Sequence, residues 1–181
     1  MFTDKIPGTN IKYTDTHDAF SVFRPMLEMT GGLSLGQLCK ITDLTPTTIQ
    51  NWVKRGYVPK PESKKYYERH LGRVLLISSL RDCMNIEEIG ELMSLINGDT
   101  DDESDDIISE SGLYDLFCKA IKEMDGKTID DKTIDGIVKK ILKNIDNKDR
   151  LSYAIKVMVY AFISGNCLKH IKLNLNELRK G

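Results

Sequence analysis

The stretch Thr45–Tyr67, TPTTIQNWVKRGYVPKPESKKYY, decides the expected fold because it joins a short capped helix to a basic, proline-containing segment. Thr45 is a good N-cap, and Pro46 suits the first helical position, where its missing N–H costs nothing. Gly56 is suited to end the helix in the left-handed conformation. The sequence therefore predicts a short helix over residues 45–55.

The two faces of this predicted helix differ in chemistry. Ile49, Trp52 and Val53 lie at i, i+3 and i+4 and form an apolar stripe, so we expect Trp52 to pack inward. At about 100° per residue, the opposite face carries the polar side chains Thr47, Gln50, Asn51, Lys54 and Arg55. Amides on such a face can pair with adenine, and cations can bind guanine or phosphate. The pattern predicts a helix that reads the major groove of duplex DNA.

The elements on either side of this helix complete a winged helix-turn-helix pattern. Ser34 is a second N-cap, and the helix that it begins ends at a turn formed by Asp43 and Leu44. After Gly56, two prolines forbid a helix and favour a small two-stranded wing with its tip near Glu62 and Ser63. Four wing side chains are expected to contact the DNA backbone: Lys60, Lys64, Lys65 and Tyr67.

Charge is segregated along the chain, although the net charge of the 181 residues is only −1. Residues 33–81 contain nine Lys or Arg and three acidic residues, whereas residues 82–118 contain twelve acidic residues and no Lys or Arg. Local fields, rather than the total charge, attract a nucleic acid. The basic block coincides with the helix-turn-helix pattern, which favours DNA as its partner.

The rest of the chain predicts helices, one of which begins at Asn85, where Asn85 and Glu88 resemble a capping box. The expected fold class is therefore all-α with a small β wing. We divide the whole chain into an N-terminal arm packing on the core, a winged helix-turn-helix, an acidic linker and a helical bundle that dimerises or receives a signal. The boundaries of these parts are residues 1–32, 33–98, 99–106 and 107–181. For residues 167–178 apolar spacing fits both a helix and a strand, and we favour the helix.

The helix-turn-helix block resembles the MerR-like superfamily. The resemblance rests on LSLGQLCKITDLTPTTIQNWVKRGYVPKP from Leu33 and on KKYYERHLGRVLLISSLRDCMNIEEIGEL from Lys64. More closely, the chain resembles an uncharacterised family of MerR-like proteins from Firmicute-type bacteria, known as a domain of unknown function. The resemblance implies a winged helix-turn-helix fold and a bacterial DNA-binding regulator.

Three departures limit what this resemblance implies. Gln50, Asn51 and Trp52 stand where the superfamily usually has arginine and tyrosines, so its base preference does not carry over. Lys65 replaces the arginine of the usual wing motif, which keeps the charge but loses the planar guanidinium. The superfamily dimerises through a long antiparallel coiled-coil helix, whereas here the corresponding helix ends near Ile96 and runs into the acidic stretch.

Other chemistry has weaker support in the sequence. We expect no enzymatic activity, because there is no Gly-rich phosphate loop, G-x-S-x-G elbow or H-E-x-x-H motif. We expect neither cofactor nor metal site. The acidic stretch fits part of a calcium-loop register, but Ser104 stands where that loop needs glycine. The four cysteines form no C-x-x-C pair and are expected to be reduced.

The expected function is a transcription regulator that binds double-stranded DNA in the bacterial cytoplasm. No signal segment or membrane-spanning stretch is expected, and no membrane partner. A homodimer through the C-terminal helices and an unidentified small-molecule effector remain open. The alternative function is a protein-interaction adaptor that uses the winged-helix scaffold without binding DNA.

Overall fold

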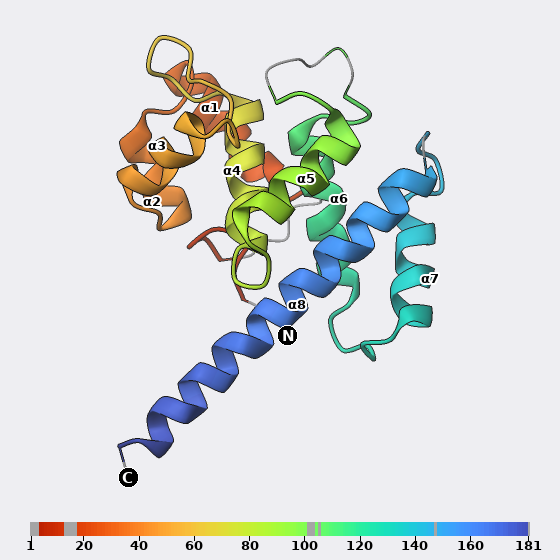
Figure 1. Ribbon diagram of the computed structural model, residues 1–181. Coiled ribbons are helices and arrows are strands. Elements are labelled where there is room, and N and C mark those ends of the chain that lie inside the picture. Colours follow the sequence, from red (N-terminus) through yellow and green to blue (C-terminus); the bar gives the residue numbers. More distant parts are fainter. Residues whose placement is uncertain (1–3, 13–17, 101–103, 105, 147, 181) are drawn as a thin grey trace.

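The computed structural model of the chain describes residues 4–12, 18–100, 104, 106–146 and 148–180. In these residues the regular elements are helices, and no strand is formed (Figure 1). They are η1 (Phe20–Val22, a 3₁₀ helix), α1 (Arg24–Thr30), α2 (Leu35–Thr42), α3 (Pro46–Lys54), α4 (Glu68–Leu80), α5 (Ile86–Asn97), α6 (Glu110–Glu123), α7 (Asp131–Ile141) and α8 (Lys148–Leu178). The prediction of an all-α fold is confirmed.

The first turns of α2, α3 and α5 are fixed by the residues that the sequence marked as caps. Ser34 Oγ accepts the N–H of Gln37 and the Gln37 side chain accepts the N–H of Ser34, which is a capping box. Thr45 Oγ1 accepts the N–H of Thr48 at 3.2 Å, and Asn85 caps α5 in a second capping box. Gly56 follows α3 with φ 79°, so the predicted helix stop is also confirmed.

The two-stranded wing predicted between Gly56 and α4 is wrong as a pair of strands. Within the described residues this segment is a loop whose only β-type pairs are the isolated bridges Glu62–Lys65 and Leu33–Tyr66. Pro59 and Pro61 lack the N–H groups that a ladder needs on one arm. On the other arm the chain reaches α4 at Glu68, so too few residues remain for a strand.

Helix α4 lies at the centre of the helices and contacts α2, α5, α6 and α8. Its residues from Leu71 to Ile77 are all buried, which fits a helix covered on every side. The N-terminal segment also enters the core through Phe20 and Phe23, and the N–H of Phe20 donates to Asp115 on α6 at 2.7 Å. Buried side chains from before and after the acidic stretch, residues 99–106, belong to one core cluster. The division into domains at these residues stays a prediction.

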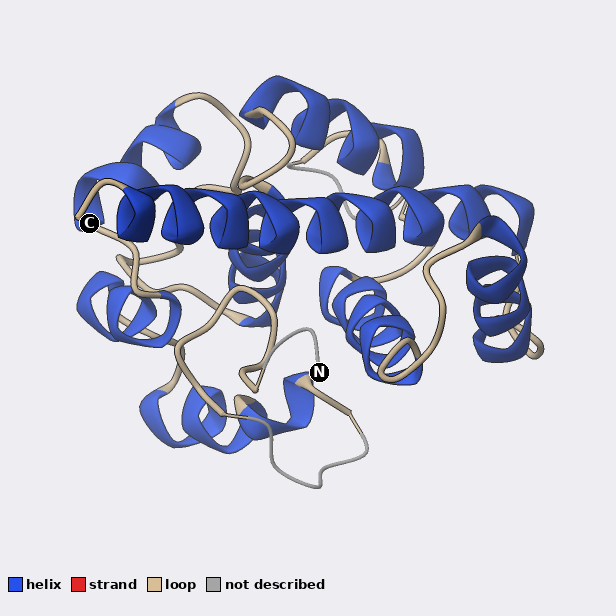
Figure 2. Ribbon diagram, turned by 90° about the horizontal axis from the view of Figure 1, so that it is seen from below, coloured by secondary structure: helices blue, strands red, loops and turns tan. Residues whose placement is uncertain are grey.

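Helix α8 confirms the helical interpretation of the tail and is far longer than the other helices. Figure 2 shows it running across the other helices, and Figure 1 shows its C-terminal half extending beyond them. By length and composition alone α8 could cross a membrane, a candidate span that the sequence prediction did not anticipate. Half of that apolar window is buried inside the protein.

Candidate nucleic-acid interface

Helix α3 presents an open polar face. Ile49 and Trp52 are buried beneath it, so the prediction that Trp52 packs inward is confirmed. On the other side, the predicted residues Thr47, Gln50, Asn51 and Lys54 are exposed. Within the described part of the chain, the side chains of Gln50, Asn51 and Lys54 make no hydrogen bond or ion pair. These amides and this cation are therefore available to an external partner.

Arg55 is the exception among the predicted residues of this helix. Its guanidinium forms an ion pair with Glu87 on α5 and lies over the Tyr57 ring, 5.0 Å from the centroid. The hydrogen bond from Arg55 to Glu87 raises the pKa of Arg55. The pKa of Glu87 is lowered by its own backbone N–H and then by Arg55. Arg55 therefore connects the end of α3 to α5, and a contact to DNA needs this pair to open.

The loop after α3 carries a minimal hairpin at its tip. Glu62 and Lys65 exchange both backbone hydrogen bonds, at 3.0 and 2.8 Å, around a two-residue turn. The turn residues Ser63 and Lys64 have φ values of 47° and 64°, the pattern of a type I′ hairpin turn. Lys64 is held at this tip with its side chain exposed, and Lys60 is exposed on the incoming arm. We call residues 57–67 the basic loop.

Lys65 fixes the basic loop to α1 rather than facing solvent fully. Its ammonium donates to the carbonyl oxygens of Thr30 and Gly32, at 3.1 and 3.2 Å. Thr30 is the last residue of α1 and Gly32 lies two residues beyond it, and a cation is favourable at this end of a helix because the last carbonyls lack helical partners. The backbone of Tyr66 also pairs with Leu33 in both directions at 2.8 Å. Lys65 and Tyr66 therefore connect the loop to the start of the helix-turn-helix.

His70 anchors the other side of the basic loop, a role that the sequence did not reveal. It is 2% exposed, and its Nδ1 accepts the N–H of Tyr67 at 3.0 Å. Its Nε2 lies 2.9 Å from the carbonyl oxygen of Lys60, which can only accept. Because one ring nitrogen accepts and the other must donate, the arrangement requires the neutral Nε2–H tautomer. One buried imidazole thus holds both arms of the loop.

The structure brings α3 and the basic loop to one end of the molecule, away from α7 (Figure 1). Eight of the nine predicted residues are exposed: Thr47, Gln50, Asn51, Lys54, Arg55, Lys60, Lys64 and Tyr67. Arg55 is exposed yet paired with Glu87 on α5, and the half-buried Lys65 is engaged with the end of α1. Neither contact could be inferred from the local pattern, because both partners come from other elements.

Metal coordination has no support in the described residues, where no group of three or more His, Cys, Asp or Glu is placed to hold an ion. The calcium-loop comparison depends on Asp101, Glu103 and Asp105, which lie outside the described residues. The four cysteines are free, in agreement with the absence of a C-x-x-C pair.

A family model matches this part of the chain. Residues 32–117 match the family model described as a domain of unknown function, DUF1836. The uncharacterized protein YkrK of Bacillus subtilis (strain 168) is 34% identical over 87 residues, which cover 46% of this chain and 37% of YkrK. No solved structure matches the chain. The family match contains α2 to α5 and the first half of α6, and therefore includes every residue of the candidate interface.

Proposed function

We propose that this chain binds double-stranded DNA with α3 in the major groove and the basic loop against the backbone. The observation that carries the proposal is the outward face of α3, on which Gln50, Asn51 and Lys54 are exposed and engaged with no other described residue. Gln and Asn can donate to and accept from adenine at once, and such amide pairs distinguish bases. The caps at Thr45 and Gly56 fix where this face begins and ends.

The proposed roles divide between base contacts and backbone contacts. Gln50 and Asn51 contact base edges, while Thr47 and Lys54 contact bases or phosphates. Lys60 and Lys64 project from the basic loop and contact phosphates, as does the exposed Tyr67 hydroxyl. Lys65 and His70 act indirectly, by holding the loop against α1 and α4. A winged helix-turn-helix of the MerR-like kind and a role in transcription regulation are parts of the same proposal.

A salt titration tests the proposal. The dissociation constant for a selected duplex is measured by fluorescence anisotropy from about 50 to 200 mM salt, after selection from a random double-stranded library. Removing one phosphate-binding cation reduces the slope of log K against log salt by about one, so Lys54→Ala and Lys64→Ala should each do so. Lys132→Ala is the matched control, because Lys132 is an exposed cation on α7. Absence of binding at low salt, or equal effects in all three variants, contradicts the proposal.

A protein-interaction adaptor is the competing function. Its prediction differs because the same face of α3 would then bind a protein and show no affinity for any duplex. A protein partner that no longer binds the Asn51→Ala variant, together with no DNA binding at about 50 mM salt, would establish the adaptor in its place.

A further inference from the structure

Helix α8 carries an exposed stripe along its whole length. Tyr153, Val157, Leu168, Ile171, Leu175 and Leu178 are among the most exposed large hydrophobic side chains of the described residues, and range from 40% to 78% exposed. Including Tyr160 and Ser164, the stripe residues are spaced 4, 3, 4, 4, 3, 4 and 3 apart. At about 100° per residue these positions fall within about 80° of one another on the helix surface. We call this set the α8 stripe.

The α8 stripe is the width and length of a coiled-coil seam. The distance from Tyr153 to Leu178 is about 37 Å at 1.5 Å per residue, or more than three heptads. The two consecutive steps of four form a stutter, which locally unwinds a left-handed supercoil. A straight pair of helices therefore suits the pattern, and α8 is drawn straight along its length in Figure 1.

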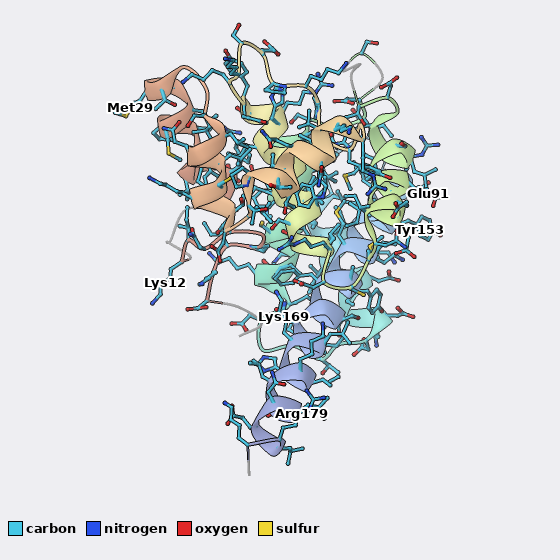
Figure 3. The ribbon with its side chains drawn as sticks, turned by 60° about the vertical axis from the view of Figure 1, so that its left-hand side comes forward. Lys12, Met29, Glu91, Tyr153, Lys169 and Arg179 are labelled. Carbon is cyan, nitrogen blue, oxygen red and sulfur yellow. The ribbon has the colours of Figure 1, made fainter. Side chains whose placement is uncertain are left out.

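The rest of the protein covers the opposite side of α8. Leu151, Ile155, Met158 and Phe162 are buried and lie about 140–200° around the helix from Tyr153. Further along, Lys169 still reaches the body through an ion pair with Asp82, at 2.6 Å. Past this point, through Arg179, the helix extends away from the body (Figure 3). Tyr160 is half-buried and its hydroxyl donates to Asp131 on α7, whereas the other residues of the stripe are exposed in the described part of the chain.

We propose that a second copy of this chain covers the α8 stripe, with the two α8 helices packed antiparallel. Charge determines the orientation. The C-terminal part of α8 and the two residues after it carry Lys169, Lys172, Arg179 and Lys180 against Glu177. In a parallel pair these basic ends lie together and repel, whereas in an antiparallel pair each end lies beside the body of the partner copy.

Helix α5 of one copy presents acidic residues near the position that the basic C-terminal end of the other copy's α8 occupies in an antiparallel pair. Helix α5 contains Glu87, Glu88 and Glu91 with no Lys or Arg, and it packs against α8. Glu91 and Tyr153 lie on the same side of the molecule in Figure 3. Leu95 on α5 is also exposed and adds an apolar contact there. In an antiparallel pair Tyr153 faces Leu178 of the other copy, which brings Arg179 and Lys180 towards α5.

This interface differs from the coiled coil of the MerR-like superfamily, because the helix in the corresponding position here is the short α5. It is also independent of DNA binding. The oligomeric state is measured without DNA, and a variant on the α8 stripe changes no residue of α3 or the basic loop. Failure of one proposal therefore leaves the other standing.

Sedimentation velocity of the full chain tests the interface. We expect the wild type to be a dimer at micromolar concentration, and Ile171→Glu with Leu175→Glu to raise the dissociation constant about a hundredfold or more. Leu173→Glu is the matched control, because Leu173 is 60% exposed on the opposite side of the same helix. All these positions lie on the extending part of α8, so circular dichroism should show unchanged helix content. A wild type that is monomeric at about 100 micromolar, or equal effects of the two variants, overturns the proposal.

A disulfide experiment tests the orientation. In a background with the exposed Cys83 and Cys167 changed to serine, Tyr153→Cys and Leu178→Cys are prepared as separate proteins and mixed. Antiparallel packing predicts that oxidation joins the two different variants, while each variant alone remains unlinked. Crosslinking of each variant to itself shows a parallel pair and overturns the proposal. Binding of monomers to anionic vesicles, abolished in Ile171→Glu, would identify a membrane surface as the occupant and overturn it as well.

Discussion

Arg73 on α4 and Glu110 on α6 form an ion pair in the protein interior, with 2.5 Å between a guanidinium nitrogen and a carboxylate oxygen. Their side chains are 4% and 3% exposed. Among the described residues, Arg73 Nε and Glu110 Oε2 have no hydrogen-bond partner. The pair joins the segments before and after the acidic stretch. The cost of removing its two charges from water is only partly offset, because these two polar atoms lack hydrogen bonds.

The first prediction concerns the stability of this pair. Arg73→Met or Glu110→Leu alone should lower the free energy of unfolding by about 3–5 kcal/mol, because each leaves an uncompensated buried charge. The double variant should restore wild-type stability or exceed it by about 1–4 kcal/mol, since apolar packing needs no desolvation of charge. Urea unfolding of the four proteins measures the coupling. A double variant as unstable as the sum of the single variants contradicts this interpretation.

The second prediction concerns pH. Burial raises the pKa of Glu110, and the charge of Arg73 opposes this shift. A carboxyl group with a raised pKa in the folded state contributes stability below its unfolded pKa of about 4.3 and loses it as the pH rises through the folded pKa. The free energy of unfolding of the double variant should therefore exceed that of the wild type by more at about pH 7 than at about pH 4. Urea unfolding at both values measures the difference, and a gain that is larger in acid contradicts the direction.

The third prediction concerns the start of α3. Thr45→Ala should lower the free energy of unfolding by about 1 kcal/mol, because the N–H of Thr48 loses its acceptor. Thr45→Ser should retain most of the stability. Thr47→Ala is the control in the same helical turn, and its effect should stay within about 0.5 kcal/mol because Thr47 is exposed. Equal losses at positions 45 and 47 would show that the cap has no special role.

The fourth prediction separates stability from DNA binding at the tip of the basic loop. Lys64 has a left-handed backbone, with φ 64°, which costs a non-glycine residue about 1 kcal/mol. Lys64→Gly should therefore fold at least as stably as the wild type while binding DNA more weakly. Thermal unfolding and anisotropy on the same samples check both effects. A loss of stability together with unchanged DNA affinity contradicts the proposed role of this lysine.

Local features of the fold were predictable from the sequence, whereas contacts between distant residues were not. The caps at Ser34, Thr45 and Asn85 depend on neighbours three residues away, so their sequence signatures sufficed. His70 could be recognised only once Lys60 and Tyr67 were placed around it. The prediction of two wing strands was wrong because the two prolines and the start of α4 at Glu68 leave no room for strands.

The candidate site shows the same division. The exposed face of α3 follows from helical periodicity, and the structure agrees for Gln50, Asn51 and Lys54. Arg55 and Lys65 were predicted as DNA-contacting cations from their sequence environment alone. Their partners, Glu87 and the carbonyl groups at the end of α1, are about 30 residues away in sequence and become neighbours only through packing. Charge counts along the chain cannot identify such pairs.

An NMR titration of the labelled protein with its selected duplex decides whether α3 and the basic loop form the DNA interface. We expect the backbone amide signals of residues 47–55, 60 and 62–64 to shift first and in proportion to bound DNA. Signals of α7 should remain unchanged, and Asn51→Ala should weaken binding by about 1–3 kcal/mol and relax base preference. Shifts confined to α7 or α8, or no shifts at low salt, would contradict the assignment of α3 and the basic loop to DNA binding.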